Sequence, residues 1–72
     1  MQMNLVDQSL CQIGIAIRER RAARRMTLGD LAAHTGMSLS FLSRVERGQA
    51  QTSVGNLIRI AEALGGTLHD LI

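Results

Sequence analysis

The chain has 72 residues, with eight Arg, no Lys, six carboxylates and a net charge of +2. It is too short for a barrel or doubly wound α/β enzyme, which needs roughly 150–250 residues. Hydrophobic residues make up 46%, too many for a disordered chain, while one Phe and no Pro, Trp or Tyr disfavour a β-sandwich. We therefore expect one all-α domain covering residues 1–72.

The positive charge is concentrated in the first two-thirds of the chain. Residues 1–48 hold seven Arg against four carboxylates, whereas residues 49–72 hold one Arg against two. Arg binds phosphates and guanine edges through its forked guanidinium, so this distribution favours a nucleic-acid partner. A solvated, Arg-rich helix face is the alternative interpretation.

Capping residues and apolar spacing predict a compact bundle of five short helices. The predicted helices cover about 10–25, 28–34, 39–47, 54–64 and 68–72. The expected N-terminal caps are Ser9, Thr27, Ser38 and either Thr52 or Ser53. Gly36 and Gly48 follow predicted helix ends, where glycine can adopt a positive φ. The apolar segment from Met1 to Val6 either extends the first helix or packs on a partner subunit.

The spacing between Leu28 and Val45 is typical of two helices that cross steeply over a tight turn. A small residue, Ala32, stands where the second helix crosses close, and Gly36 supplies the turn. Leu31 and the apolar residues of the next helix fill the angle between the two helices. This is helix-turn-helix geometry, in which the second helix can enter a major groove of DNA.

At these positions the sequence resembles the Cro/repressor family, also called XRE-type helix-turn-helix domains. The resemblance covers about Ile13 to Ile72. It rests on the segments Met26-Thr27-Leu28-Gly29-Asp30-Leu31-Ala32, Gly36-Met37-Ser38, Leu42-Ser43-Arg44-Val45-Glu46-Arg47-Gly48 and Leu57-x-x-Ile60-Ala61-x-Ala63-Leu64-Gly65. It implies a lambda-repressor-like fold of five helices and a DNA-binding transcriptional regulator that acts as a homodimer on a near-palindromic operator.

The resemblance also implies which residues bind DNA. The helix opened by Ser38 is the expected recognition helix, and Arg44 can fork onto guanine O6 and N7. Position 28 departs from the family pattern, because Leu stands where many relatives carry a DNA-contacting Gln. The expected DNA-binding residues are Thr27, Leu28, Ser38, Leu39, Ser40, Ser43, Arg44, Arg47, Gln49, Gln51 and Thr52.

Two further expectations concern structure and assembly. In the family, an Arg of the first helix pairs with the Glu of the Glu-Arg-Gly segment, so we predict a partly buried ion pair between Arg21 and Glu46. Leu68, Leu71 and Ile72 form a candidate dimer interface, with ordinary packing onto the neighbouring helices as the alternative.

The sequence does not favour a metal-binding, cofactor-binding or catalytic function. His34 and His69 lack partners at ligand spacing, so no metal is expected, and no cofactor is expected either. We expect no enzyme, because the sequence shows no Ser-His-Asp or paired-carboxylate arrangement and the chain is too short to form a catalytic cleft. The lone Cys11 and the absence of a secretory signal favour the cytoplasm. An antitoxin that neutralises a toxin and also binds its operator remains a rival, as does the DNA-binding domain of a longer regulator. A toxin or polymerase is the candidate protein partner.

Overall fold

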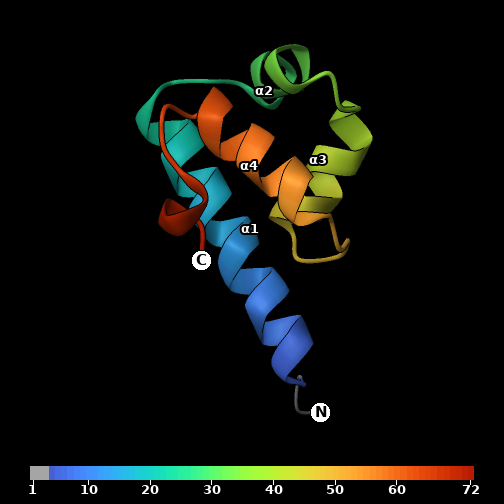
Figure 1. Cartoon of the computed structure of the whole chain (residues 1–72). Coiled ribbons are helices and arrows are strands. Elements are labelled where there is room, and N and C mark those ends of the chain that lie inside the picture. Colours follow the sequence, from blue (N-terminus) through green and yellow to red (C-terminus); the bar gives the residue numbers. More distant parts are fainter. Residues whose placement is uncertain (1–3) are drawn as a thin grey trace.

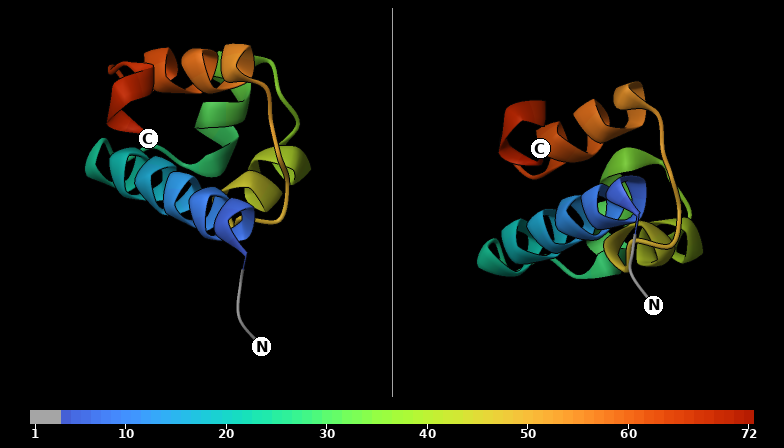
Figure 2. Two further views of the ribbon diagram at one scale, coloured as in Figure 1. Left: turned by 60° about the horizontal axis from the view of Figure 1, so that its bottom comes forward. Right: turned by 90° about the horizontal axis from the view of Figure 1, so that it is seen from below.

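The computed structural model describes residues 4–72 and consists of helices connected by short turns (Figure 1). Helix α1 extends beyond the other helices at its N-terminal end, and α4 lies on the opposite side of the fold from α1 (Figure 2). No strand occurs among the described residues. The elements are α1 (Leu5–Ala23), α2 (Leu28–Thr35), α3 (Leu39–Glu46), α4 (Val54–Ala63) and a 3₁₀ turn, η1 (Leu68–Asp70).

One hydrophobic core connects these elements. Its centre is formed by four aliphatic side chains, one from each α-helix, that are completely shielded from solvent: Ile17, Leu31, Leu42 and Ile60. Helix α1 packs on α3, α2 packs on both α3 and α4, and α4 packs on η1. The buried apolar residues are Ile17, Leu31, Leu42, Val45, Leu57, Ile60, Ala61, Leu64 and Leu71.

Helix α1 begins five residues earlier than predicted. Its N-terminal cap is Asn4, whose side-chain oxygen accepts a hydrogen bond from the backbone N–H of Asp7 at 2.8 Å. Ser9 is therefore an interior residue, and its prediction as the cap is wrong: Asn4 followed by a first-turn Asp makes an equally good start. Leu5 and Val6 extend the helix, while Met1 and Met3 lie outside the described residues.

The prediction of a fifth α-helix is also wrong. The segment after α4 forms a three-residue 3₁₀ turn, in which the Asp70 carboxylate accepts a bond from the Thr67 N–H at 2.8 Å. The backbone bonds that follow span three residues, from the Asp70 N–H to the Thr67 carbonyl and from the Leu71 N–H to the Leu68 carbonyl, which is the 3₁₀ pattern. Leu71 packs in the core with 3% of its surface exposed, so it offers little surface to a partner.

The turn between α2 and α3 is fixed from both sides. The buried hydroxyl of Thr35 donates to the Leu31 carbonyl at 2.9 Å and accepts from the Met37 N–H at 3.3 Å. Gly36 follows with φ of 73°, as its position predicted. From α4, the Arg59 guanidinium donates to the Thr35 carbonyl. The sequence analysis missed both Thr35 and Arg59.

Helices α1 and α3 approach so closely that only glycine fits at Gly14. A Cβ there would lie 2.4 Å from the Glu46 carbonyl oxygen and 2.6 Å from that of Val45. Both obstacles are backbone atoms of α3, which cannot move away like the end of a side chain. Gly14 therefore sets the spacing between the first helix and the third.

Replacing Gly14 with Ala should lower the free energy of unfolding by about 1–3 kcal/mol, because the added methyl forces α1 away from α3. Urea denaturation followed by circular dichroism measures the change. Gly29→Ala is the matched control, since its Cβ would meet nothing nearer than 3.7 Å. That variant should be neutral or slightly stabilising, because Ala favours a helix over Gly; equal loss in both variants would contradict the close-approach explanation.

Candidate nucleic-acid interface

Helix α3 presents an open polar face to solvent. Its apolar residues Leu42 and Val45 are buried, which turns the opposite side outward. The residues predicted for that side follow this arrangement: Leu39, Ser40, Arg44 and Arg47 are exposed, and Ser43 is half-buried. Among residues 4–72, no hydrogen bond or ion pair holds the Arg44 guanidinium, so its donors are available to a ligand.

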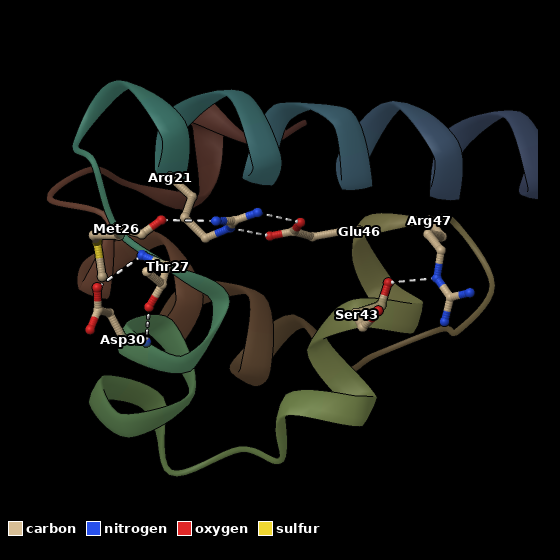
Figure 3. A network of polar contacts seen from close by, with 7 residues as sticks. All are labelled: Arg21, Met26, Thr27, Asp30, Ser43, Glu46 and Arg47. Carbon is tan, nitrogen blue, oxygen red and sulfur yellow. Dashed lines mark hydrogen bonds and ion pairs between the residues drawn. The ribbon is translucent and has the colours of Figure 1, made fainter.

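Arg47, at the C-terminal end of α3, is less free than Arg44. Its Nε donates to the Ser43 carbonyl at 3.2 Å, one turn earlier in the same helix (Figure 3). Arg47 thus covers a helix-terminal carbonyl, an interaction that stabilises helix ends. Its remaining guanidinium donors still face solvent.

The first turn of α2 adjoins the start of α3. The Thr27 hydroxyl accepts from the Asp30 N–H at 3.0 Å, and the Asp30 carboxylate accepts from the Thr27 N–H at 2.8 Å, forming a capping box (Figure 3). These hydrogen bonds to Thr27 lower the pKa of the Asp30 carboxyl below its ordinary value. A Cβ on Gly29 would lie 3.7 Å from the Thr27 hydroxyl and 4.0 Å from Leu39, so these residues form one continuous surface.

Two other residues predicted to contact DNA, Leu28 and Ser38, also stabilise the fold. Leu28 is half-buried and packs against the core, so little of its side chain is available to DNA. Ser38 caps α3: its hydroxyl oxygen accepts from the Phe41 N–H at 3.1 Å. The hydroxyl proton of Ser38 remains available as a donor.

Of the three residues predicted to contact DNA from the loop before α4, two are accessible. Gln49 and Gln51 are exposed, and the Gln49 N–H donates to the Arg44 carbonyl at 2.8 Å, which anchors the loop to α3. The Thr52 hydroxyl oxygen is buried and has no hydrogen-bond partner among the described residues. The expectation that Thr52 contacts DNA is therefore wrong for this conformation, and Ser53 is the cap of α4.

An ion pair behind this surface joins α1 to the end of α3. Arg21 Nε lies 2.7 Å from Glu46 Oε2 and Arg21 Nη2 lies 3.0 Å from Oε1, a two-point contact (Figure 3). Arg21 Nη1 also donates to the Met26 carbonyl at 2.8 Å. The hydrogen bonds that Arg21 donates to the Glu46 carboxylate raise the pKa of Arg21 above its already high value, against the opposing effect of burial. The predicted Arg21–Glu46 pair is present, and it also fixes the turn between α1 and α2.

Two features are absent from the described part of the chain. Within residues 4–72, no three His, Cys, Asp or Glu side chains gather as a metal-binding group. In the same part of the chain, none of the helices has the length and apolar character to cross a membrane.

Removing either member of the Arg21–Glu46 pair should lower the free energy of unfolding by about 3 kcal/mol, because the remaining charge stays partly desolvated. The side chains are only 17% and 8% exposed, so solvent screens them weakly. Denaturant unfolding of Arg21→Ala, Glu46→Ala and the double variant would give the coupling energy. Single-variant losses that simply add in the double variant would contradict an energetic role for the pair.

Comparisons with known proteins agree with this geometry. A sequence model of the helix-turn-helix family matches residues 17–71. The chain is 38% identical over 56 residues to the HTH-type transcriptional regulator DdrOP3 of Deinococcus deserti and 35% identical over 48 residues to an HTH-type regulator, y4dL, of Sinorhizobium fredii. The matches include 78% and 67% of this chain, but they span only 43% and 24% of those relatives.

Two solved structures have the same fold over nearly the whole chain. The restriction-modification controller protein C.AhdI from Aeromonas hydrophila matches with a TM-score of 0.87 and 32% identity, covering 90% of this chain and 98% of that one. The clp gene regulator ClgR from C. glutamicum matches with a TM-score of 0.80 and 33% identity, covering 96% and 86%. The chain thus belongs to the helix-turn-helix family of transcriptional regulators.

Proposed function

We propose that this chain binds a specific, near-palindromic DNA operator as a homodimer and represses or tunes the adjacent promoter. The observation that carries the proposal is the outward face of α3, where the exposed Arg44 has unoccupied donors on the same side as two small hydroxyl residues, Ser40 and Ser43. We further propose that the chain has no enzymatic activity and that it acts in the cytoplasm, where its DNA partner would be found.

The mechanism divides the contacts between bases and backbone. Helix α3 enters the major groove, where Arg44 forks onto a guanine and Leu39 touches a thymine methyl. Thr27, at the start of α2, and Gln49 and Gln51, before α4, hold the sugar-phosphate backbone on either side. In the dimer, the two copies of α3 lie about 34 Å apart, one turn of DNA, so bound protein blocks the promoter or contacts polymerase.

The dimer interface is proposed at the C-terminal side, centred on Ile72. Ile72 is 70% exposed and borders a groove of about 280 Å³ that Leu71 and three residues of α1, Ser9, Gln12 and Ile13, also line. Leu68 is half-buried. An exposed isoleucine at the edge of an uncharged groove offers self-complementary surface to a second copy, in which each Ile72 enters the other's groove.

Arg44→Ala should reduce the preference for the operator by about 5- to 150-fold for each half-site, since a bidentate Arg–guanine contact contributes about 1–3 kcal/mol of discrimination. Fluorescence anisotropy titrations on the DNA upstream of the protein's own gene and on an unrelated duplex measure it. The wild-type chain should prefer its own site by about 10³-fold or more. Arg24→Gln is the charge-matched control: Arg24 lies against Gly65 near the end of α4, away from α3.

Two results would count against this function. Equal binding of both duplexes by the wild-type chain would remove the claim of sequence specificity. Failure to bind either duplex, together with a toxin that copurifies from the host in equal amounts, would instead support the antitoxin alternative.

Ile72→Asp should raise the dissociation constant of the dimer by tenfold or more, because it places a charge in an apolar contact. Sedimentation equilibrium should find the wild-type chain at twice its 7.8 kDa mass and the variant nearer the monomer. Leu39→Asp is the control, since Leu39 is an exposed apolar residue on the proposed DNA face. An unchanged dimer in Ile72→Asp would move the interface elsewhere.

A further inference from the structure

The turn between α1 and α2 contains the one described non-glycine residue with a left-handed backbone. Arg25 has φ of 55°, whereas the other described residues with positive φ are glycines, Gly36, Gly48 and Gly65. An L-residue with a long side chain is disfavoured in this region, because its Cβ crowds the neighbouring carbonyl. Glycine at position 25 would adopt the same turn without that strain.

The backbone around Arg25 is held in place by bonds that its own side chain does not make. Its N–H donates to the Ala22 carbonyl at 3.0 Å, and the next N–H, that of Met26, donates to the Arg21 carbonyl at 3.0 Å. The Met26 carbonyl in turn accepts from Arg21. The turn is thus determined by its surroundings, and the fold gives no structural reason for an arginine at this position.

The side chain of Arg25 is exposed, and no ion pair or hydrogen bond within residues 4–72 holds its guanidinium. Its neighbour differs: Arg24 packs its guanidinium over Gly65, at the end of α4. The two adjacent arginines therefore differ: the guanidinium of Arg24 packs on the protein, whereas that of Arg25, the left-handed residue, is free to bind a ligand.

The position of Arg25 sets its reach relative to the proposed DNA face. Two residues of chain span at most about 7 Å, so Arg25 lies within that distance of Thr27, which is continuous with Leu39 of α3 through Gly29. With α3 in the major groove, an arginine at this position would lie near the sugar-phosphate backbone at the edge of that groove. The base edges would instead face Leu39 and Ser40 of α3.

We propose that Arg25 contacts a DNA phosphate at the edge of the groove and that the left-handed strain is retained for this contact. The inference rests on the proposed function, since it needs α3 in the major groove. It assigns Arg25 to affinity and Arg44 to sequence discrimination, two effects that separate experimentally.

The test compares Arg25→Gln with Arg24→Gln, which remove the same charge from adjacent positions. Binding to the upstream duplex and to an unrelated duplex is titrated over a range of salt concentrations. Arg25→Gln should weaken binding to both duplexes alike, by about three- to tenfold or more. It should also reduce the slope of log affinity against log salt by about 1.8, the value for two phosphates, one for each subunit of the proposed dimer. Arg24→Gln should leave the slope unchanged.

Two further variants separate the side chain from the backbone. Arg25→Lys keeps the charge and should retain most of the affinity, as a phosphate contact tolerates a point charge. Arg25→Gly should bind as weakly as Arg25→Gln while raising the thermal midpoint by a few degrees, because glycine relieves the positive φ.

The outcomes that overturn the inference are distinct from those that overturn the function. If the wild-type chain binds its site and Arg44→Ala loses specificity, but Arg25→Gln matches Arg24→Gln, only the phosphate contact is refuted. If Arg25→Gln changes the preference between the two duplexes, Arg25 reads a base and the assignment to a phosphate is wrong. If the wild-type chain binds neither duplex, the function and the contact fail together.

Discussion

The two-point ion pair between Arg21 and Glu46 is the interaction on which the candidate site depends. It joins the first helix to the last residue of α3, and the same guanidinium binds the Met26 carbonyl ahead of α2. One partly buried cation thus joins α1 to the end of α3, 25 positions away, and to the turn that follows α1. Because Gly14 lets the α3 backbone approach α1, the pair is both short and shielded. The pair therefore fixes α3 against α1 on the side away from its open face.

Much of this architecture was predictable from the sequence, for reasons that are local. Gly36 and Gly48 mark helix ends because glycine alone adopts a left-handed backbone without strain, and Ser38 and Thr27 mark helix starts because their hydroxyls cap free N–H groups. Two periodic positions, Leu42 and Val45, sufficed to predict which side of α3 faces solvent. The Arg21–Glu46 pair came from the resemblance to a family, not from spacing.

The errors occurred where long-range contacts or competing local signals decide the structure. Two plausible caps, Asn4 and Ser9, lie five residues apart, and nothing local reveals which one starts α1. The last segment has a capping box that is typical of a helix start, yet it forms a single 3₁₀ turn with Leu71 buried in the core, a tertiary contact that no local pattern indicates. The bond from Arg59 to the Thr35 carbonyl spans 24 positions, and no sequence pattern indicates it.

The brevity of α3 limits what a single copy could recognise. Eight residues rise about 12 Å along the helix axis, which corresponds to about four base pairs of B-form DNA. A sequence of four base pairs recurs by chance about once in every 250, so one such helix cannot mark a unique promoter in a genome. When two half-sites are read together, the probabilities of their chance occurrence multiply, so the combined site is far rarer. A single copy of the domain therefore reads too few base pairs to select one promoter, whereas the proposed homodimer would read two half-sites together.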